Sequence, residues 1–203
     1  MTKQIRQNQD LYVAPQMLGR YVNNSAEVLD ERNGEILNPL DVDDKIKIYE
    51  RQVKEWFLHR ATRFLAGTKN GFVVLMISAG YIEGVEQYRQ GETSERTNNR
   101  LGRSKDFFRK GMIRIFSISP TLADELYSQL RCGLFHNGMA SEKIIISSQY
   151  RNSIEKIDDT EIHINPNLFL RDIKIDFYHY IRELKVFDNN QLRNNFNVMF
   201  NLV

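Results

Sequence analysis

FVVLMISAGYI, residues 72–82, is the longest apolar run in the chain, and this stretch decides the fold. It is too short to cross a bilayer, which takes about 20 residues. Its apolar side chains point in nearly every direction around a helix, which is typical of a helix at the centre of a bundle. The sequence therefore predicts a buried helix from about Phe72 to Tyr88, preceded by the turn Lys69-Asn70-Gly71.

Helical spacing of apolar residues predicts four more helices around this one. The first begins near residues 41–44 and ends at Gly67, and another covers about 104–117. Ser119-Pro120 gives an N-cap followed by proline at the first helical position, so a further helix begins there. The last helix covers about 166–187. We therefore expect the fold class to be mostly α.

Strand patterns occur in two places. Asn33-Gly34 lies between two short apolar runs, which is a hairpin signal within the otherwise irregular residues 1–40. Residues 143–147 and 161–164 are expected to form a small β-hairpin, about 143–164. The expected division is thus an N-terminal segment, a helical domain over 41–187, and a tail over 188–203 that docks as a short helix or frays.

The composition is that of an ordinary globular protein. With 203 residues, 41% of them hydrophobic, the chain is long enough to bury a core as one domain. The single cysteine, Cys132, excludes an internal disulfide and a multi-cysteine zinc site, and fits a reducing compartment. The polar start Met1–Gln9 lacks the apolar core of a signal peptide. We therefore expect a cytoplasmic protein without a membrane partner.

Several familiar catalytic patterns are missing from the sequence. It has no glycine-rich phosphate loop, no dinucleotide fingerprint, no His-Glu-x-x-His and no Gly-x-Ser-x-Gly. His163 and His179 have no second ligand at metal spacing. We therefore expect neither a metal site nor a cofactor.

One segment does combine groups suited to chemistry: Arg131-Cys132-Gly133-Leu134-Phe135-His136. Arginine can hold two phosphate oxygens, and histidine transfers protons near neutral pH. RNA carries its own nucleophile, the 2′-hydroxyl, so no metal is required. On an ideal α-helix Arg131 and His136 are about 140° apart, so the arginine would have to lean toward the histidine. In the structural alternative, Arg131 caps helix carbonyls and His136 is a hydrogen-bonded core residue.

The longer string Leu130–Met139, LRCGLFHNGM, resembles the motif at a helix end in the HEPN superfamily, an Arg followed after four to six residues by His. The resemblance covers roughly residues 41–187. It implies a HEPN-like helical bundle with a small β-hairpin after the motif helix. It also implies a homodimer in which the two motifs meet, and a metal-independent endoribonuclease from a prokaryotic toxin–antitoxin or phage-defence system. By this resemblance Arg131 binds the scissile phosphate and His136 is the acid–base residue.

The resemblance has one departure. Cys132 stands where active family members often carry Asn, Asp or His, and a thiol is a weak hydrogen-bond partner. Asn137 is a candidate for the missing polar contact. Glu83 is a carboxylate within an apolar helix and needs a partner, for which Arg131 and His136 are candidates, unless it lies on the surface. A catalytically inert HEPN module that binds RNA or a partner protein therefore remains the alternative.

Residues 96–114 carry seven basic side chains and one acidic one, Asp106. Such a local excess can meet RNA phosphates, although a solvated helix face has the same pattern. The expected partners are RNA, a second copy of the chain, and an antitoxin or defence-system protein. The residues expected to contact RNA are Arg100, Arg103, Lys105, Arg109 and Lys110.

Overall fold

The computed structural model describes residues 5–66, 70–95 and 102–203, except for the side chain of Asn137. It contains helices together with a four-stranded and a three-stranded sheet, so the fold is α+β. The expectation of a mostly α fold, a HEPN-like helical bundle with a small β-hairpin after the motif helix, is therefore wrong.

The chain forms two compact units. The described residues of the first lie within Met1–His59, Tyr88–Glu92 and His179–Val203, and those of the second within Arg60–Gln87 and Thr93–Tyr178. Neither end of the helical domain expected over 41–187 coincides with a boundary between the units. Two of the boundaries fall inside long helices, which therefore contribute residues to both units. The spacing of apolar residues along a helix stays the same across such a boundary, so the sequence does not reveal it.

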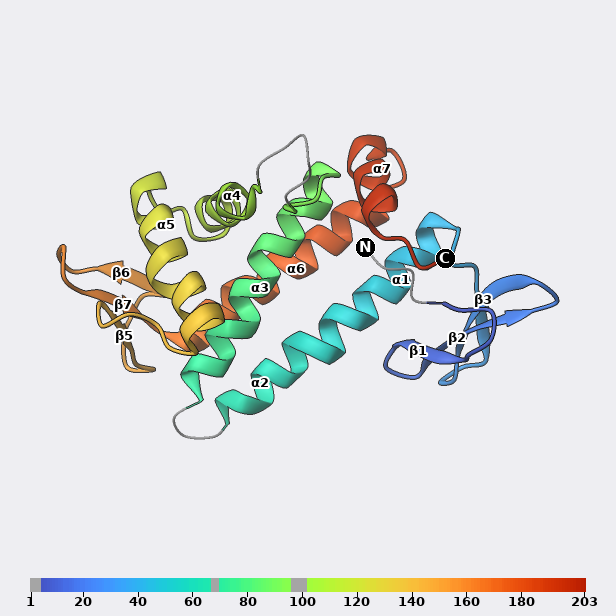
Figure 1. Ribbon diagram of the computed structural model, residues 1–203, viewed down its shortest axis with the longest axis horizontal. Coiled ribbons are helices and arrows are strands. Elements are labelled where there is room, and N and C mark those ends of the chain that lie inside the picture. The colour runs from blue at the N-terminus through green and yellow to red at the C-terminus, as the bar shows by residue number, and fades with distance from the viewer. Residues whose placement is uncertain (1–4, 67–69, 96–101) are drawn as a thin grey trace. The chain divides into compact units, whose positions relative to one another are not determined.

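The first unit begins with an antiparallel sheet in the order β1-β2-β3-β4 (Figure 1). The hairpin expected around Asn33-Gly34 is the β3–β4 pair, and Gly34 has the left-handed backbone (φ +75°) that its turn requires. Residues 11–22, expected to be irregular, instead add two further strands, β1 and β2, to this hairpin. The turn that joins β2 to β3, Asn23-Asn24, also has positive φ at both residues, a weaker signal in the sequence than Asn-Gly. The strands are β1 Leu11–Ala14, β2 Met17–Val22, β3 Ser25–Asp30 and β4 Glu35–Leu37.

Helices complete the core of the first unit. α1, Val42–Arg51, begins at Asp41, whose carboxylate accepts hydrogen bonds from two backbone N–H groups of the first turn. It continues without a break into the π-helix η1, Gln52–Leu58. The tail forms α7, Asn190–Met199, and brings Phe196 within 5.3 Å of Tyr49, measured between ring centroids. Burial among these aromatic rings raises the pKa of Tyr88 to about 12.

The helices expected in the second unit are confirmed, with bounds close to the predicted ones. α3 buries the apolar side chains of Leu75 and Ile82, but Val73 remains 39% exposed. α3 is therefore not enclosed on every side, as a helix at the centre of a bundle would be. The expected end of the preceding helix at Gly67 lies outside the described residues. The helices are α2 His59–Leu65, α3 Gly71–Gln90, α4 Ser104–Phe116, α5 Pro120–Leu126, the π-helix η2 Tyr127–Asn137, and α6 Pro166–Lys185.

Three short strands follow η2: β5 Ile144–Ile146, β6 Ile154–Lys156 and β7 Ile162–Ile164. The expected hairpin is wrong in its pairing, because β5 and β7 are parallel and β6 pairs antiparallel with β7. Parallel strands cannot be joined by a tight turn and need a long connection. The polar stretch that connects β5 to β7 was expected to be a loop, but it contains β6. In Figure 1 this sheet lies beside α5, and Lys156 of β6 forms an ion pair with Glu125 of α5 at 3.0 Å.

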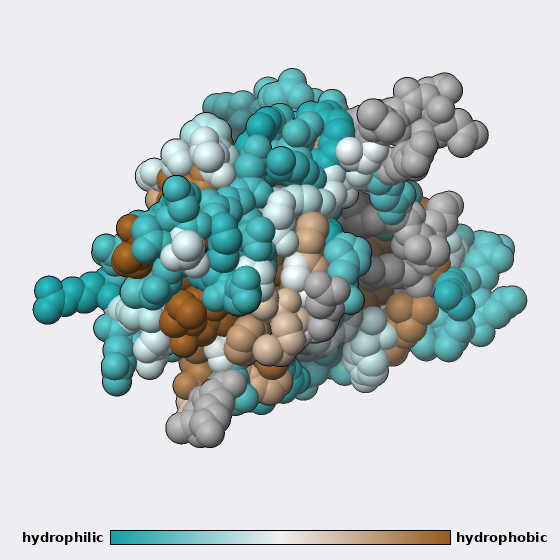
Figure 2. Space-filling view, turned by 60° about the vertical axis from the view of Figure 1, so that its left-hand side comes forward, coloured by the Kyte–Doolittle hydropathy of each residue, from teal (hydrophilic) through white to brown (hydrophobic). Residues whose placement is uncertain are grey.

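The surface mixes polar and apolar side chains. Figure 2 shows apolar residues, in brown, as separate patches among polar residues, in teal. Scattered exposed apolar side chains are common on folded proteins. Within the part of the chain described here, no helix is both long and apolar enough to span a membrane.

Asp30 and Arg51 form a two-pronged ion pair that joins β3 to α1, with N–O distances of 3.0 and 2.6 Å. Hydrogen bonding to Arg51 lowers the pKa of Asp30. A lowered folded-state pKa contributes stability above the unfolded value of about 4, and this stability is lost as pH falls through the folded pKa.

We predict that Asp30→Asn lowers the free energy of unfolding at pH 7 by about 2–3 kcal/mol, because the mostly buried Arg51 loses its nearer counter-charge and keeps the more distant Glu55, at 3.9 Å. The difference from wild type should shrink below about pH 4. Urea unfolding from pH 7 to pH 3 measures both effects. Lys47→Gln is the control, because the exposed ion pairs of Lys47 are worth less than about 1 kcal/mol. A difference that stays constant with pH would contradict this account.

Candidate active site

The motif helix is not an α-helix over the motif. α5 continues into η2, Tyr127–Asn137, in which backbone hydrogen bonds join each residue to the fifth before it. Residues five apart therefore point in more similar directions on η2 than they would on an α-helix, and lie about one turn apart. The separation of about 140° expected on an ideal α-helix does not apply to Arg131 and His136. The backbone of η2 brings the two positions closer together around the helix axis than an α-helix would.

Two glycines shape the end of this helix. Gly138 ends it in a left-handed conformation, with φ +70°. The chain then turns back along η2, and the Ser141 N–H donates to the Gln129 carbonyl at 2.9 Å. A Cβ atom on Gly133 would lie 2.6 Å from the carbonyl oxygen of Met139, so only glycine permits this approach. The chain itself therefore makes a close approach at Gly133.

Arg131 is held on three sides. Its Nη2 donates to the Glu83 carboxylate of α3 at 2.9 Å. Its guanidinium carbon also lies 5.6 Å from the ring centroid of Tyr127 and 4.9 Å from that of Phe135, which are cation–π distances. The side chain remains 20% exposed, and the bond to Glu83 uses one of its five N–H groups. A phosphate can therefore reach the guanidinium from solvent.

Glu83 is the centre of a small polar network. Besides Arg131 it accepts hydrogen bonds from the hydroxyls of Ser94, at 2.9 Å, and Ser104, at 2.8 Å. The Tyr127 hydroxyl in turn donates to Ser104 at 3.2 Å. The Glu83 side chain is 12% exposed, so the alternative of a surface glutamate is wrong. The partner that its place in an apolar helix demands is Arg131.

His136 has a different environment from Arg131. It is exposed, and no hydrogen bond or ion pair joins its side chain to another described residue. It therefore does not fit the alternative of a hydrogen-bonded core histidine. It lines a hollow of about 370 Å³ together with Cys132 and Gly133. The remaining lining residues are Ser128, Gln129, Met139, Ala140 and Ser141.

The structure thus gathers some of the expected site residues and separates others. Arg131 and Glu83 are in contact, and His136 lies one turn further along η2. Cys132 faces the hollow beside His136 and is partly exposed. The side chain of Asn137 lies outside the described part of the chain. Among the described residues, no group of three His, Cys, Asp or Glu side chains is arranged to hold a metal ion.

Most of the described cations in the basic segment lie beside an acidic side chain. Lys105 lies 3.2 Å from Asp124 of α5, and Arg109 lies 3.8 Å from the same carboxylate. Arg103 pairs with Asp106 at 3.6 Å and stacks on Phe107, over whose ring Lys110 also lies. Asp106 is the one acidic residue within 96–114, and the sequence did not indicate Asp124 because it belongs to the next helix, α5. Arg96 and Arg100 lie outside the described residues.

Sequence reasoning missed several residues of this region. Tyr127 lies four positions before Arg131, so helical spacing could have identified it as a neighbour. Ser94 and Ser104 come from either side of a long connection, and no local pattern joins them to Glu83. Gln129 and Ser141 enter the hollow only because the chain turns back after Gly138.

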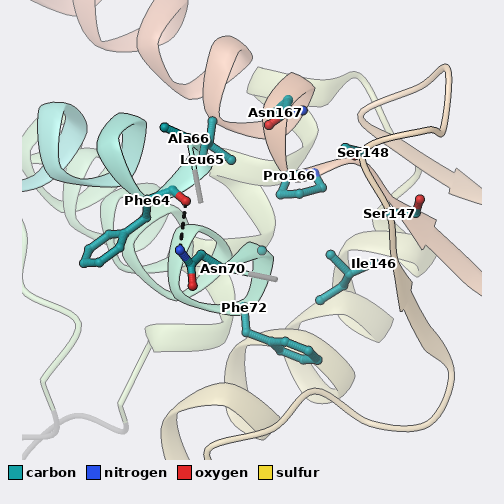
Figure 3. A pocket seen from close by; sticks show the side chains of 11 residues that line it. Phe64, Leu65, Ala66, Asn70, Phe72, Ile146, Ser147, Ser148, Pro166 and Asn167 are labelled. Atoms are coloured by element: carbon teal, nitrogen blue, oxygen red, sulfur yellow. Dashed lines mark hydrogen bonds between the residues drawn. The ribbon is translucent and has the colours of Figure 1, made fainter. Parts of the chain in front are cut away.

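A second hollow, of about 530 Å³, lies where α3 and α6 begin (Figure 3). Phe64, Phe72 and Pro166 are among its apolar lining residues, and the Asn70 amide donates to the Phe64 carbonyl at 3.1 Å. None of the site residues expected from the sequence lines it. Its described lining includes no side chain that gains or loses a proton in the ordinary pH range, whereas the other hollow has His136 and Cys132, so the hollow beside His136 is the better candidate for chemistry.

Comparison with protein-family models, with curated proteins and with solved structures found no match to this chain.

We predict that Gly133→Ala lowers the free energy of unfolding by about 1–3 kcal/mol, because the new methyl group collides with backbone atoms of the returning turn. Gly84→Ala is the matched control. A Cβ atom at Gly84 meets nothing within 4 Å, so this variant should gain about 1 kcal/mol from helix propensity. Urea unfolding of both variants gives the comparison. An equal gain in both would show that the turn does not pack against Gly133.

Proposed function

We propose that this chain is a metal-independent endoribonuclease of the HEPN type, in which Arg131 binds the scissile phosphate and His136 transfers protons. The observation that carries the proposal is that η2 places Arg131 and His136 on successive turns, with each side chain at least partly open to solvent. His136 has its imidazole open to solvent, and Arg131 has N–H groups to spare. The proposal rests on the motif and this geometry, and not on a helical-bundle fold.

The chemistry that these groups support is transesterification. The 2′-oxygen of RNA attacks the adjacent phosphorus, the bond from phosphorus to the 5′-oxygen breaks, and a 2′,3′-cyclic phosphate forms. One proton leaves the 2′-hydroxyl and one joins the departing 5′-oxygen. His136 can take up the first or supply the second, and Arg131 offsets the negative charge that builds on the phosphate oxygens.

A single imidazole cannot be base and acid in the same step. A homodimer that brings two copies of the motif together would supply both roles, so we propose that the active form is a homodimer. We further propose a cytoplasmic role as the toxin of a toxin–antitoxin pair or as a phage-defence component, partnered by an antitoxin or defence protein. The resemblance of residues 130–139 to the HEPN motif supports these roles.

The second candidate is a catalytically inert HEPN module that binds RNA or a partner protein. The ion pair between Arg131 and Glu83 favours it, because a carboxylate already occupies part of the guanidinium. Cys132, a weak hydrogen-bond partner beside Arg131, favours it too. In that case wild type binds but does not cleave. Binding to RNA phosphates would weaken steeply with salt, whereas binding to a protein partner through apolar contacts would not.

We predict that wild type cleaves RNA in excess EDTA and leaves 2′,3′-cyclic phosphate ends. His136→Ala should lower the cleavage rate by about 10²–10⁴-fold through loss of proton transfer. Arg131→Ala should also lose cleavage, because nothing then offsets the charge on the phosphate. Gel analysis of labelled RNA, followed by mapping of the fragment ends, measures rate and chemistry together.

His179→Ala is the matched control for these variants. His179 is an exposed histidine on α6 near Glu183, and its removal should leave cleavage unchanged. Circular dichroism of each variant checks that the fold is kept. If His136→Ala and Arg131→Ala both cleave at the wild-type rate, the site is elsewhere. If well-folded wild type does not cleave, the binding module is the better account.

A further inference from the structure

The hollow beside His136 has the size and shape of a site for one small ligand. One wall is the face of η2 that carries Ser128, Gln129, Cys132 and His136, and the other is the returning turn with Met139 and Ser141. Its volume of about 370 Å³ falls near the lower end of the range for ligand pockets, roughly 300–1,000 Å³. The wall formed by the turn is fixed by the backbone hydrogen bond between residues 141 and 129.

Unused hydrogen-bonding groups converge on this hollow. The Gln129 amide makes no hydrogen bond to any described residue, so both its donor and its acceptor are available. The Ser141 hydroxyl accepts from the Lys143 N–H at 3.3 Å, which leaves its own hydrogen to donate. A ligand with neighbouring donors and acceptors along one edge suits this arrangement, as a nucleobase suits the amide of glutamine.

The remaining lining is apolar and uncharged. It contains the thiol of Cys132, the backbone of Gly133 and the flexible side chain of Met139, which is 59% exposed. No Lys, Arg, Asp or Glu is found among the described residues that line the hollow. A neutral flat ring is therefore a better occupant than a phosphate, because a phosphate would be left without a counter-charge other than His136.

The order of side chains around η2 relates this hollow to the proposed cleavage site. Arg131 turns toward Glu83 and Phe135, whereas Cys132, the next residue, faces the hollow. His136 lies one turn further on, between these two directions, and lines the hollow itself. A phosphate at Arg131 would thus place the base of an adjacent nucleotide within reach of the hollow.

We propose that this hollow receives one unstacked nucleobase of single-stranded RNA, from a nucleotide beside the scissile phosphate, and that Gln129 reads its edge. This inference rests on the proposed function, because it takes Arg131 as the phosphate contact. Single-stranded RNA is the implied substrate class, since a base held in a duplex cannot be turned out into a side pocket without loss of pairing.

The first test uses the only cysteine of the chain as a reporter. The rate of alkylation of Cys132 by iodoacetamide is measured with each of the four nucleoside 3′-monophosphates and with ribose 5-phosphate. A bound base slows the reaction by a factor of 1 + [L]/Kd, about tenfold at ten times Kd. We expect protection by at least one nucleotide and none by ribose 5-phosphate. Absence of protection by all four, or equal protection by ribose 5-phosphate, would overturn the proposal.

The second test follows sequence preference at the cut. A pool of single-stranded RNA with randomised sequence is cleaved by wild type, by Gln129→Leu and by Gln129→Glu. Wild type should cleave about tenfold faster beside one base than beside the others. This is the discrimination expected when a side chain makes two hydrogen bonds to the edge of a base. Gln129→Leu should lose this preference and Gln129→Glu should change it. Gln149→Leu, at an exposed glutamine outside the hollow, is the control and should keep the wild-type preference.

The two tests separate this inference from the proposed function. If wild type cuts no RNA but a nucleotide protects Cys132, the hollow binds a base and the nuclease proposal fails. If wild type cuts RNA while Cys132 gains no protection and Gln129→Leu keeps the preference, the nuclease proposal stands and the hollow is not a base site.

Discussion

The carboxylate of Glu83 must be partnered, because it lies on the most apolar helix of the chain and is almost removed from water. Its three partners come from three places: Arg131 on η2, Ser104 at the start of α4, and Ser94 after α3. Arranging these partners fixes the positions of η2 and the start of α4 against α3. Arg131 therefore stabilises the fold, whether or not it also takes part in a reaction. A phosphate that binds Arg131 would have to share the guanidinium with Glu83.

The π-helical hydrogen bonding of η2 decides which side chains can act together. With α-helical bonding Arg131 would share a side with Phe135 and would lie far around the helix from His136. In η2 Phe135 lies against the guanidinium, and His136 is exposed about one turn further along the helix. π-helical segments are rare and occur often at functional sites, which agrees with the place of the motif here.

The spacing of apolar residues located most helices, because a long stretch with helical spacing, such as residues 166–187, is compatible with a helix and not with a strand. The sheets were harder to predict. A run of three residues such as Ile144–Ile146 identifies a strand but not its partner, and the direction of pairing depends on residues far along the chain. For the site, the sequence indicated Arg131, His136 and the need of Glu83 for a partner. It could not give the π-helix, the serines on Glu83 or the neutralisation of α4 by Asp124, because these depend on hydrogen-bond register and on contacts between distant segments.

Charge balance around the motif bears on what an RNA strand would gain by binding. Arg131 is neutralised by Glu83, and Lys105 and Arg109 of α4 lie beside Asp124. Affinity for nucleic acid that comes from phosphates grows with the number of free cations, so these described residues would contribute little of it. Phe135 is 46% exposed beside Arg131, and the hollow with Gln129 opens next to His136. Aromatic stacking and base-edge hydrogen bonds are the interactions that these surfaces offer, and both require unpaired bases. A site built in this way would discriminate between RNA strands by the bases that they expose more than by their charge.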